Sequence, residues 1–391
     1  MKKKENVMTS LRCNTLRIFW SVCISLIYFG DSAAAGMIWA WGGNDSGQLG
    51  IGTKGTRPYT APVQIKSVSD MSAVAARFDV SLALKSDGTV WVWGDNGMGL
   101  LGDGTTINRL NPAQVDGLGG VIAIAGGRYH SLALKGDGTV WAWGENGNGQ
   151  LGDGTTTIRM SPVQVSGLVG VIAIAGGRYH SLALKADGTM WTWGENSNGQ
   201  LGDGTTTNRL NPVRAGSLGD IAAIAAGGEH NLALKKNGTL WTWGANQSGQ
   251  LGDGTTAAQS NPVRISALTN VLAIATGGDH SLAVRMDGTV WAWGSNWAGQ
   301  VGDGTILNRS SPVKIIGLDG MVAVAAGHFF SMSLKSDGTV WVWGPNKDGQ
   351  LGDGTTTNHF SPVQVQGLKG VSALAGGNDH CLAIVDFVLP K

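Results

Sequence analysis

The chain has 391 residues, among them 63 Gly, 16 Trp and 10 Pro, and its formal net charge is +1. Glycine exceeds its usual share of roughly 7%, yet it falls well short of the one third found in collagen, and no three-residue period is present. Because 42% of the residues are hydrophobic and only 14% are charged, a disordered chain is not expected. So much glycine also disfavours a mainly helical protein, which leaves a β-rich fold with many turns.

The first 35 residues have the composition of a secretory signal peptide. Basic residues begin the chain at positions 2–4, 12 and 17, an apolar run follows over residues 18–30, and small residues precede Gly36. The apolar run is shorter than the ~20 residues of a membrane-spanning helix. We therefore expect cleavage after Ala35, export of the chain, and no membrane segment in the mature protein.

The mature chain, residues 36–391, carries a slightly negative net charge and one cysteine, Cys381. A chain without a basic face lacks what duplex binding requires, so no nucleic-acid partner is expected. An exported chain with one cysteine forms no internal disulfide and depends on packing for its stability. Cys381 occupies a position where most other repeats have serine, so it is predicted to be a small core residue.

A period of fifty residues organises the mature chain. The motif Trp-x-Trp-Gly recurs seven times, and a proline recurs in step with it. The motif begins at Trp39, Trp91, Trp141, Trp191, Trp241, Trp291 and Trp341. Seven such periods span nearly all of residues 36–391, so this segment is predicted to be one domain built from seven repeats.

Within each repeat, residue character alternates with a period of two, as it does in β-strands. The two tryptophans of residues 139–144 share one face, and residues 121–125 and 130–134 alternate in the same way. Both faces are apolar, which predicts strands buried on both sides. Asp137-Gly138 indicates a two-residue hairpin of type I′ between the second and third strands. A short segment such as residues 112–115 supplies a fourth strand.

Four-stranded antiparallel units repeated radially form a β-propeller. The last repeat supplies residues 362–365, 371–375 and 380–384 but has no Trp-x-Trp-Gly, whereas the mature chain begins with that motif at Trp39. These fragments are complementary. We therefore predict an all-β, seven-bladed β-propeller with four antiparallel strands per blade, in which the N-terminal strand completes the C-terminal blade.

A longer motif surrounds each tryptophan pair, and at residues 126–152 it reads Gly-Gly-Arg-Tyr-His-Ser-Leu-Ala-Leu-Lys-x-Asp-Gly-Thr-x-Trp-x-Trp-Gly-x-Asn-x-x-Gly-Gln-Leu-Gly. This repeat resembles that of the regulator of chromosome condensation family, and the resemblance covers essentially all of the mature chain. It implies a seven-bladed propeller that serves as a protein-binding scaffold. Members of the family include a nuclear nucleotide-exchange factor for a small GTPase, a plant ultraviolet-B photoreceptor and a secreted bacterial inhibitor of β-lactamases.

The chain departs from each of these members. It lacks the basic tail of the exchange factor, and Arg128-Tyr129 and its equivalents stand where the photoreceptor has tryptophans. The repeats of the exported inhibitor are shorter than those of this chain. By compartment the inhibitor is nevertheless the nearest parallel, so the chain is expected to be an exported, bacterial-type member.

Three patterns with potential chemistry have simpler structural interpretations. Gly97-x-Gly-x-x-Gly102 matches a dinucleotide fingerprint, but no helix is predicted to follow it. Asp103 and its equivalents lack the spacing of a calcium loop. His130 and its equivalents belong to separate blades, too far apart to share a metal ion. We expect turn-forming glycines, aspartates bonded to their own turns and buried histidines bonded to backbone, with no cofactor, no metal and no catalytic residue.

The residues that break the repeat are the candidate recognition site. Most of them precede the histidine position, in loops that a propeller gathers on one face near the channel mouth. Arginine and aromatic side chains there are typical of protein-binding surfaces. Ordinary loop variation is the alternative interpretation. The predicted partner-binding residues are Arg77, Phe78, Arg128, Tyr129, Arg178, Tyr179, Glu229, Asp279, Trp297, His328, Phe329 and Phe330.

The function that follows is a secreted, non-catalytic, monomeric propeller that binds an unidentified protein through loops on one face. A carbohydrate-binding module or hydrolase at the channel mouth is the first alternative, and the exposed Trp297 would suit a sugar. A nucleotide-exchange factor for a small GTPase is the second alternative, and the export signal disfavours it.

Overall fold

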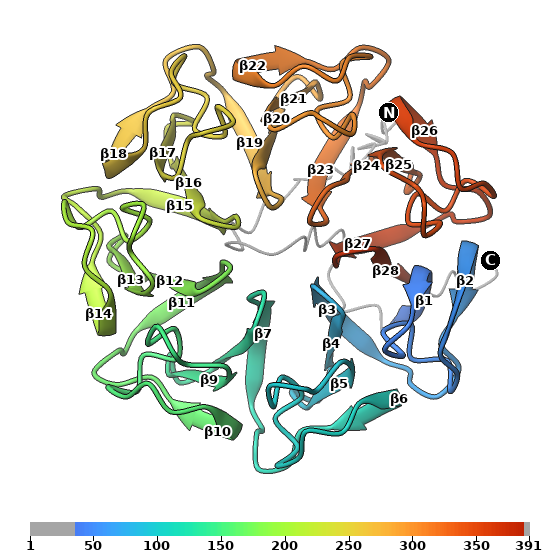
Figure 1. The fold of residues 1–391 in the computed structure, drawn as a ribbon, viewed down its shortest axis with the longest axis horizontal. Helices are drawn as coiled ribbons and strands as arrows, with labels where there is room; N and C mark the ends of the chain where they lie inside the picture. Colours follow the sequence, from blue (N-terminus) through green and yellow to red (C-terminus); the bar gives the residue numbers. More distant parts are fainter. Residues whose placement is uncertain (1–35, 387–391) are drawn as a thin grey trace, which may run out of the picture.

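The computed structural model describes residues 36–386, and strands form all of the regular structure in this range. Seven four-stranded blades surround a central axis, as Figure 1 shows, so the predicted all-β propeller is confirmed. No helix between residues 36 and 386 is long and apolar enough to cross a membrane. The predicted signal peptide, residues 1–35, lies outside the described residues.

In blades 1–6 four consecutive strands run from the axis to the rim. The strands of blades 1–3 are β3 (Met71–Arg77), β4 (Val80–Lys85), β5 (Val90–Gly94) and β6 (Arg109–Gln114); β7 (Val121–Gly126), β8 (His130–Lys135), β9 (Val140–Gly144) and β10 (Arg159–Gln164); and β11 (Val171–Gly176), β12 (His180–Lys185), β13 (Met190–Gly194) and β14 (Arg209–Arg214). The strands of blades 4–6 are β15 (Ile221–Ala226), β16 (His230–Lys235), β17 (Leu240–Gly244) and β18 (Gln259–Arg264); β19 (Val271–Thr276), β20 (His280–Arg285), β21 (Val290–Gly294) and β22 (Arg309–Lys314); and β23 (Met321–Ala326), β24 (Ser331–Lys335), β25 (Val340–Gly344) and β26 (His359–Gln364).

Blade 7 joins the two ends of the described chain. Its inner strands are β27 (Val371–Gly376) and β28 (His380–Asp386), and its outer strands are β1 (Gly36–Asn44) and β2 (Gly55–Gln64). Strand β1 pairs with β28 from Gly36↔Asp386 to Gly42↔His380. The predicted closure is therefore confirmed, and β2 adds a second N-terminal strand to it. The sequence pattern assigned residues 362–365 to this blade, and that assignment is wrong. These residues lie in or next to β26, the rim strand of blade 6.

A separate hydrophobic core fills each of the seven junctions between neighbouring blades in residues 36–386. The second tryptophan of every pair is fully buried in such a core. Trp143 of blade 2, for example, packs among Val90, Val92 and Leu101 of blade 1 and donates from Nε1 to the Leu100 carbonyl over 2.8 Å. The first tryptophan of each pair is only partly buried. The second tryptophan of each pair therefore holds adjacent blades together.

The glycines of the apparent dinucleotide fingerprint serve the same packing. Gly102 has a φ of +68°, and a Cβ there would lie 2.8 Å from the Trp143 indole. Strand β6 follows this loop, and no helix is present to meet a phosphate. The equivalent glycine of each other repeat faces the indole of the next blade in the same way. In this chain the last glycine of the fingerprint therefore leaves room for the indole of the next blade.

The hairpin turn differs from the predicted type I′. Leu134 pairs with Val140, and the Gly138 amide donates to the Lys135 carbonyl over 2.9 Å, so the connection is longer than two residues. Only Gly138 has a positive φ (+79°), whereas a type I′ turn requires one at both central residues. The geometry is that of a type I turn followed by a glycine bulge. Asp137 Oδ1 accepts from the amide and the hydroxyl of Thr139, which stabilises this turn.

Candidate binding face

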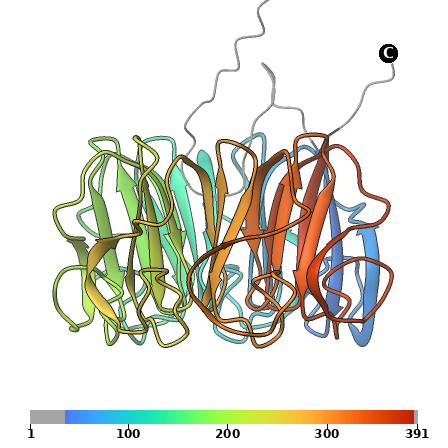
Figure 2. The ribbon, with the colours of Figure 1, turned by 90° about the horizontal axis from the view of Figure 1, so that it is seen from above.

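Two loops of every blade reach the same face of the propeller. In blade 2 they are residues 127–129, between β7 and β8, and the loop after β9; they adjoin because His130 pairs with Gly144 and the Glu145 amide donates to the Tyr129 carbonyl. We call this side the loop face. The opposite side, the hairpin face, carries the Asp-Gly turns and the ends of the described chain, since Gly36 pairs with both Asp386 and Met71. Figure 2 shows the disc edge-on.

A belt of backbone hydrogen bonds joins the blades around the axis on the loop face. In it, an amide of one blade donates to a carbonyl of the next over 2.8–2.9 Å. The bonds run from Arg128 to Gly177, Arg178 to Gly228, Gly228 to Gly278, Gly278 to His328, His328 to Gly377 and Asn378 to Phe78. Within the described residues no such bond links Phe78 to the loop of blade 2. The belt is therefore open at the junction between blades 1 and 2.

Beneath this belt lies a ring of buried histidines. His130 Nε2 lies 2.8 Å from Ser181 Oγ of blade 3, and that hydroxyl donates to the Gln150 carbonyl. Ser181 must therefore accept from His130, which assigns the proton to Nε2. Equivalent contacts join His180 to Asn231, His230 to Ser281, His280 to Ser331 and His380 to Ser81. The predicted burial is confirmed, but the predicted backbone partner is wrong, because each imidazole bonds a side chain of the next blade.

The ring is interrupted at Val80 and Phe330, and each interruption has a compensating change. A Cβ at Gly127 would lie 2.1 Å from His130 Cε1, so the histidine requires glycine three residues before it. In blade 1 Arg77 stands at that glycine position, and the smaller Val80 replaces the histidine. The ring and the belt are therefore altered together in the blade that carries Arg77.

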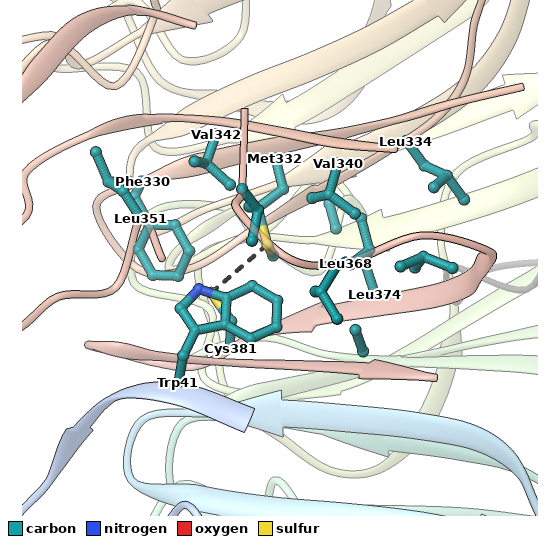
Figure 3. Close-up of a cluster of buried hydrophobic side chains, with 14 of the residues drawn as sticks. Trp41, Phe330, Met332, Leu334, Val340, Val342, Leu351, Leu368, Leu374 and Cys381 are labelled. Atoms are coloured by element: carbon teal, nitrogen blue, oxygen red, sulfur yellow. Dashed lines mark hydrogen bonds between the residues drawn. The ribbon is translucent and has the colours of Figure 1, made fainter. Parts of the chain in front are cut away.

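Phe330 was predicted to bind a partner, and that prediction is wrong. Its side chain is fully buried in the core between blades 6 and 7. Figure 3 shows it in the cluster that contains Trp41, Met332 and Cys381. Phe330 replaces a ring histidine, and Cys381 replaces the serine that would accept from it. Cys381 Sγ donates to the Gln350 carbonyl over 3.3 Å, as the serines do, so its predicted role as a small core residue is confirmed.

This pair predicts a coupled effect on stability. We expect Phe330→His to lower the free energy of unfolding by about 1–3 kcal/mol, because a buried imidazole donor would face a thiol, a weak acceptor. Adding Cys381→Ser restores the repeat arrangement and should recover part of that loss. Equilibrium unfolding in urea of the two single variants and the double variant measures the coupling. Additive effects would contradict the proposed pairing.

Five of the predicted residues form one continuous cluster on blades 1–3, the aromatic–arginine ladder: Phe78, Arg128, Tyr129, Arg178 and Tyr179. The ring centroids of Phe78 and Tyr129 lie 5.6 Å apart, and those of Tyr129 and Tyr179 lie 5.1 Å apart in a stacked arrangement. The Arg128 guanidinium lies 4.7 Å from the Phe78 centroid and 5.2 Å from the Tyr129 centroid. Arg178 lies over Tyr179 and pairs with Glu229 over 3.3 Å. All five residues lie at the open junction or next to it.

A second aromatic cluster lies on blades 5 and 6. Trp297, whose side chain is 59% exposed, meets Phe329 edge-on with centroids 5.4 Å apart, and His328 contacts Phe329. Burial lowers the pKa of His328 to about 3, with a smaller contribution from the charge of Arg77. The imidazole of His328 is therefore neutral at physiological pH. Asp279 lies on the same face, on blade 5. Partial desolvation of its carboxyl group and the charge of Glu229 raise its pKa.

Acidic residues gather on the remaining side of the loop face, on blades 6, 7 and 1. Burial raises the pKa of Asp79 to about 6, and the charges of Asp95 and Asp45 add to that effect. The pKa of Asp379 is also raised to about 6, by burial and by the charge of Asp348. None of these five aspartates is among the predicted partner-binding residues, because in the sequence they are visible only as acidic positions in loops on different repeats.

The recurring aspartate of Gly-Asp-Gly-Thr is bonded to its own turn, as predicted. Asp103 Oδ1 accepts from the amide and the hydroxyl of Thr105, and Oδ2 pairs with Arg109 over 2.7 Å. Burial opposes the charge of Asp103, but these hydrogen bonds outweigh it and hold its pKa below the ordinary value. In the described part of the chain no group of three or more His, Cys, Asp or Glu side chains is arranged to hold a metal ion.

Comparison with known proteins identifies relatives of the chain. The zebrafish (Danio rerio) protein RCC2 homolog is 42% identical over 71 residues, which are 18% of this chain and 14% of that protein. Protein RCC2 of Mus musculus is 41% identical over 71 residues, 18% of this chain and 13% of that protein. The matches thus span a small part of the length of both relatives.

Solved structures share the fold across nearly the whole chain. Human WBSCR16 superposes with a TM-score of 0.80 at 24% identity and covers 90% of this chain and 100% of its own. Prp20p of Saccharomyces cerevisiae superposes with a TM-score of 0.83 at 24% identity and covers 93% of this chain and 94% of its own. A family model described as "RCC1-like domain" matches residues 19–270 and 168–386, which together are most of the sequence. The chain therefore belongs to the RCC1-like domain family.

Proposed function

We propose that this chain is an exported, non-catalytic propeller that binds another protein on its loop face, with the aromatic–arginine ladder as the main contact. The observation that carries the proposal is the position of the irregular residues. The repeats are otherwise nearly alike, yet five of the residues that differ form a stacked cluster at or beside the junction where the belt is open within residues 36–386. Stacked tyrosines with arginine between them are rigid and amphipathic, which is typical of the residues that dominate binding energy.

Two further observations support the proposal. Proteins with this fold bind other proteins: Prp20p was studied for its binding to Gsp1p and histones, and yeast RCC1 was solved with Kap60 bound. Export is supported by the composition of residues 1–35, which has the basic start, apolar run and small residues of a secretory signal peptide.

Affinity capture from the medium of the source cells tests the proposal. A tag at the C-terminus is suitable because Asp386, the last described residue, ends a strand on the hairpin face. We expect a triple variant with Phe78, Tyr129 and Tyr179 changed to alanine to retain the partner at least tenfold less than the wild type, since each such contact contributes 1–2 kcal/mol or more. The mass of the recovered protein should correspond to a start at Gly36.

The matched control is Met286→Ala, which removes a side chain that is 70% exposed, in a hairpin on the other face. It should capture the partner as the wild type does. Equal capture by the triple variant would remove the ladder from the proposed site, and a chain that retains residues 1–35 inside the cell would remove export.

Nucleotide exchange on a small GTPase is a second candidate, and membership of the RCC1-like domain family is the observation that favours it. Release of labelled GDP from a purified small GTPase measures this activity directly. Acceleration that depends on the ladder would replace the exported-scaffold proposal, whereas an unchanged release rate would leave it standing.

A further inference from the structure

Arg77 is the most irregular residue of the propeller. Glycine occupies its position in the other blades of the repeat pattern, at Gly127, Gly177, Gly227, Gly277, Gly327 and Gly377. Its Cβ lies against blade 2, where a Cβ on Gly126 would come within 3.0 Å of it. Its charge lowers the pKa of His180 and His280, on blades 3 and 5, in addition to that of His130 on the adjacent blade. Arg77 ends β3, the inner strand of blade 1, so it lies near the axis that all the blades share.

No carboxylate within residues 36–386 pairs with this guanidinium, and the charge of Asp279 offsets only part of the cost of burying it. The Arg77 side chain is 9% exposed, yet neither it nor Arg128 forms an ion pair or a hydrogen bond to a carboxylate within residues 36–386. Burial and the neighbouring Arg128 lower the pKa of Arg77 to about 10, so the group stays charged at neutral pH. A buried charge without a partner is costly, and the chain holds one at the centre of its proposed binding face.

Arg128 adds a second donor group without a partner. Its guanidinium is held between Phe78 and Tyr129, and its Nε is buried without a hydrogen-bond acceptor. Arg178, by contrast, has Glu229 as its partner. Arginine presents a planar fork of N–H donors that matches the two oxygens of a carboxylate.

We infer that Arg77 and Arg128 form a receptor for one carboxylate group, supplied by an acidic side chain of the bound protein. The inference rests on the proposed function and specifies the chemistry of the partner: an aspartate or glutamate that reaches toward the axis, with apolar neighbours that pack on Phe78, Tyr129 and Tyr179. A carboxylate suits the site better than a phosphate does. Glu229 and Asp279 already lie on this face, so a dianion would meet more repulsion than a monoanion would.

The receptor can be tested on the purified protein without its partner, with acetate as the probe. Thermal unfolding is measured in sodium acetate and in sodium chloride at equal ionic strength and pH 7. At about ten times its Kd, acetate should raise the Tm of the wild type by on the order of 2 °C. Arg77→Met should abolish this difference. It should also unfold at or above the wild-type Tm in chloride, because it removes an uncompensated buried charge while keeping the length of the side chain.

Lys347→Met is the control, because it removes an exposed positive charge on the same face, away from the ladder. It should keep the full acetate effect. The assignment would be overturned if acetate still raised the Tm of Arg77→Met. It would also be overturned if, after the Tm change of Arg77→Met in each salt is subtracted, phosphate raised the Tm of the wild type more than acetate does. If Arg77→Met does not fold, the arginine Nε–Hε resonances of the wild type are followed instead: acetate should shift those of Arg77 and Arg128, and unchanged resonances would overturn the inference. Failure of either test with ladder-dependent capture intact removes the carboxylate receptor and leaves the proposed function in place.

Discussion

Acidification from pH 7 to pH 5 is expected to destabilise the propeller by several kcal/mol. Burial lowers the pKa of His130, His230, His280 and His380 to about 3, and that of His180 to about 4. In the unfolded chain the same groups bind protons near pH 6.5. Because the unfolded state then binds more protons than the folded state, the free energy of unfolding falls as the pH falls from about 6.5 toward 4. Each histidine contributes up to about 1.4 kcal/mol per pH unit.

Carboxyl groups with a raised pKa act in the opposite direction, and they are Asp79, Asp379, Asp279, Glu145 and Glu195. The folded-state pKa of Asp79 and of Asp379 is raised to about 6, so the folded protein takes up these protons before the unfolded chain does, and both groups favour folding as the pH falls below 6. Both are partly exposed, and solvent screening reduces their effect. The five ring histidines and His328, whose pKa is also lowered to about 3, outweigh these partly exposed carboxyl groups. The net effect of acid is therefore loss of stability, which urea titrations at pH 7, 6 and 5 measure.

The molecule supplies its own control for this pH dependence. Between blades 6 and 7 a phenylalanine and a cysteine replace the histidine and serine of the ring. Carrying the same pair into the junction between blades 5 and 6, as His280→Phe with Ser331→Cys, removes one titrating group and keeps the packing. The dependence of stability on pH should become shallower by the contribution of one histidine. A slope unchanged from the wild type would show that the buried ring does not cause the acid sensitivity.

The fold could be predicted from the sequence because the Trp-x-Trp-Gly motif and the alternation around it recur seven times. A period of fifty with alternation inside it specifies the number of blades, and the incomplete last repeat specifies the closure. The hairpin type could not be predicted in this way, because Asp-Gly indicates a turn without stating how many residues separate the paired positions. Only the pairing of Leu134 with Val140 and the single positive φ at Gly138 decide it.

The candidate site could be predicted in position and not in detail. Comparison of repeats shows which residues differ, but it does not show which of them face solvent. Phe329 and Phe330 are adjacent and chemically identical, yet the first belongs to the aromatic cluster with Trp297 and the second to a core. The histidine partners were missed for a similar reason. Four of them lie 51 residues further on, in the next blade, and the partner of His380 is Ser81 of blade 1, so no local sequence pattern indicates these contacts.

The coupled change at Arg77 and Val80 carries the most information about function. With glycine and histidine at these two positions, as in blade 2, both the belt and the ring could close at this junction. In this chain the change leaves Ser131 without a histidine donor, opens the belt at Phe78 and introduces a charge that forms no ion pair with a carboxylate in residues 36–386. These changes concentrate at one junction, beside the stacked tyrosines. We therefore expect local stability to be reduced at the proposed binding site, as is common where strain is stored at functional sites.

Replacing Trp143 with alanine should lower the free energy of unfolding by about 3–5 kcal/mol, the range for deleting a large aromatic side chain from a packed core. The indole is fully buried and fills the junction between blades 1 and 2. Its loss also removes the hydrogen bond to the Leu100 carbonyl, although Ser131 Oγ still donates to that oxygen over 3.0 Å. The cost should therefore come from the lost packing and the cavity rather than from an unsatisfied carbonyl.

Trp141 is the matched control, since it is the same residue type two positions away on the same strand. Its ring is only partly buried, with Lys135 Nζ 4.3 Å from the ring centroid and Thr139 accepting from its Nε1. Trp141→Ala should cost about 1–2 kcal/mol, because less apolar surface is removed from contact. Urea unfolding followed by far-ultraviolet circular dichroism, with m-values compared, separates the two variants. Equal losses of stability in the two variants would mean that the second tryptophan does not hold the blades together. The stability of the propeller would then come mainly from its strands.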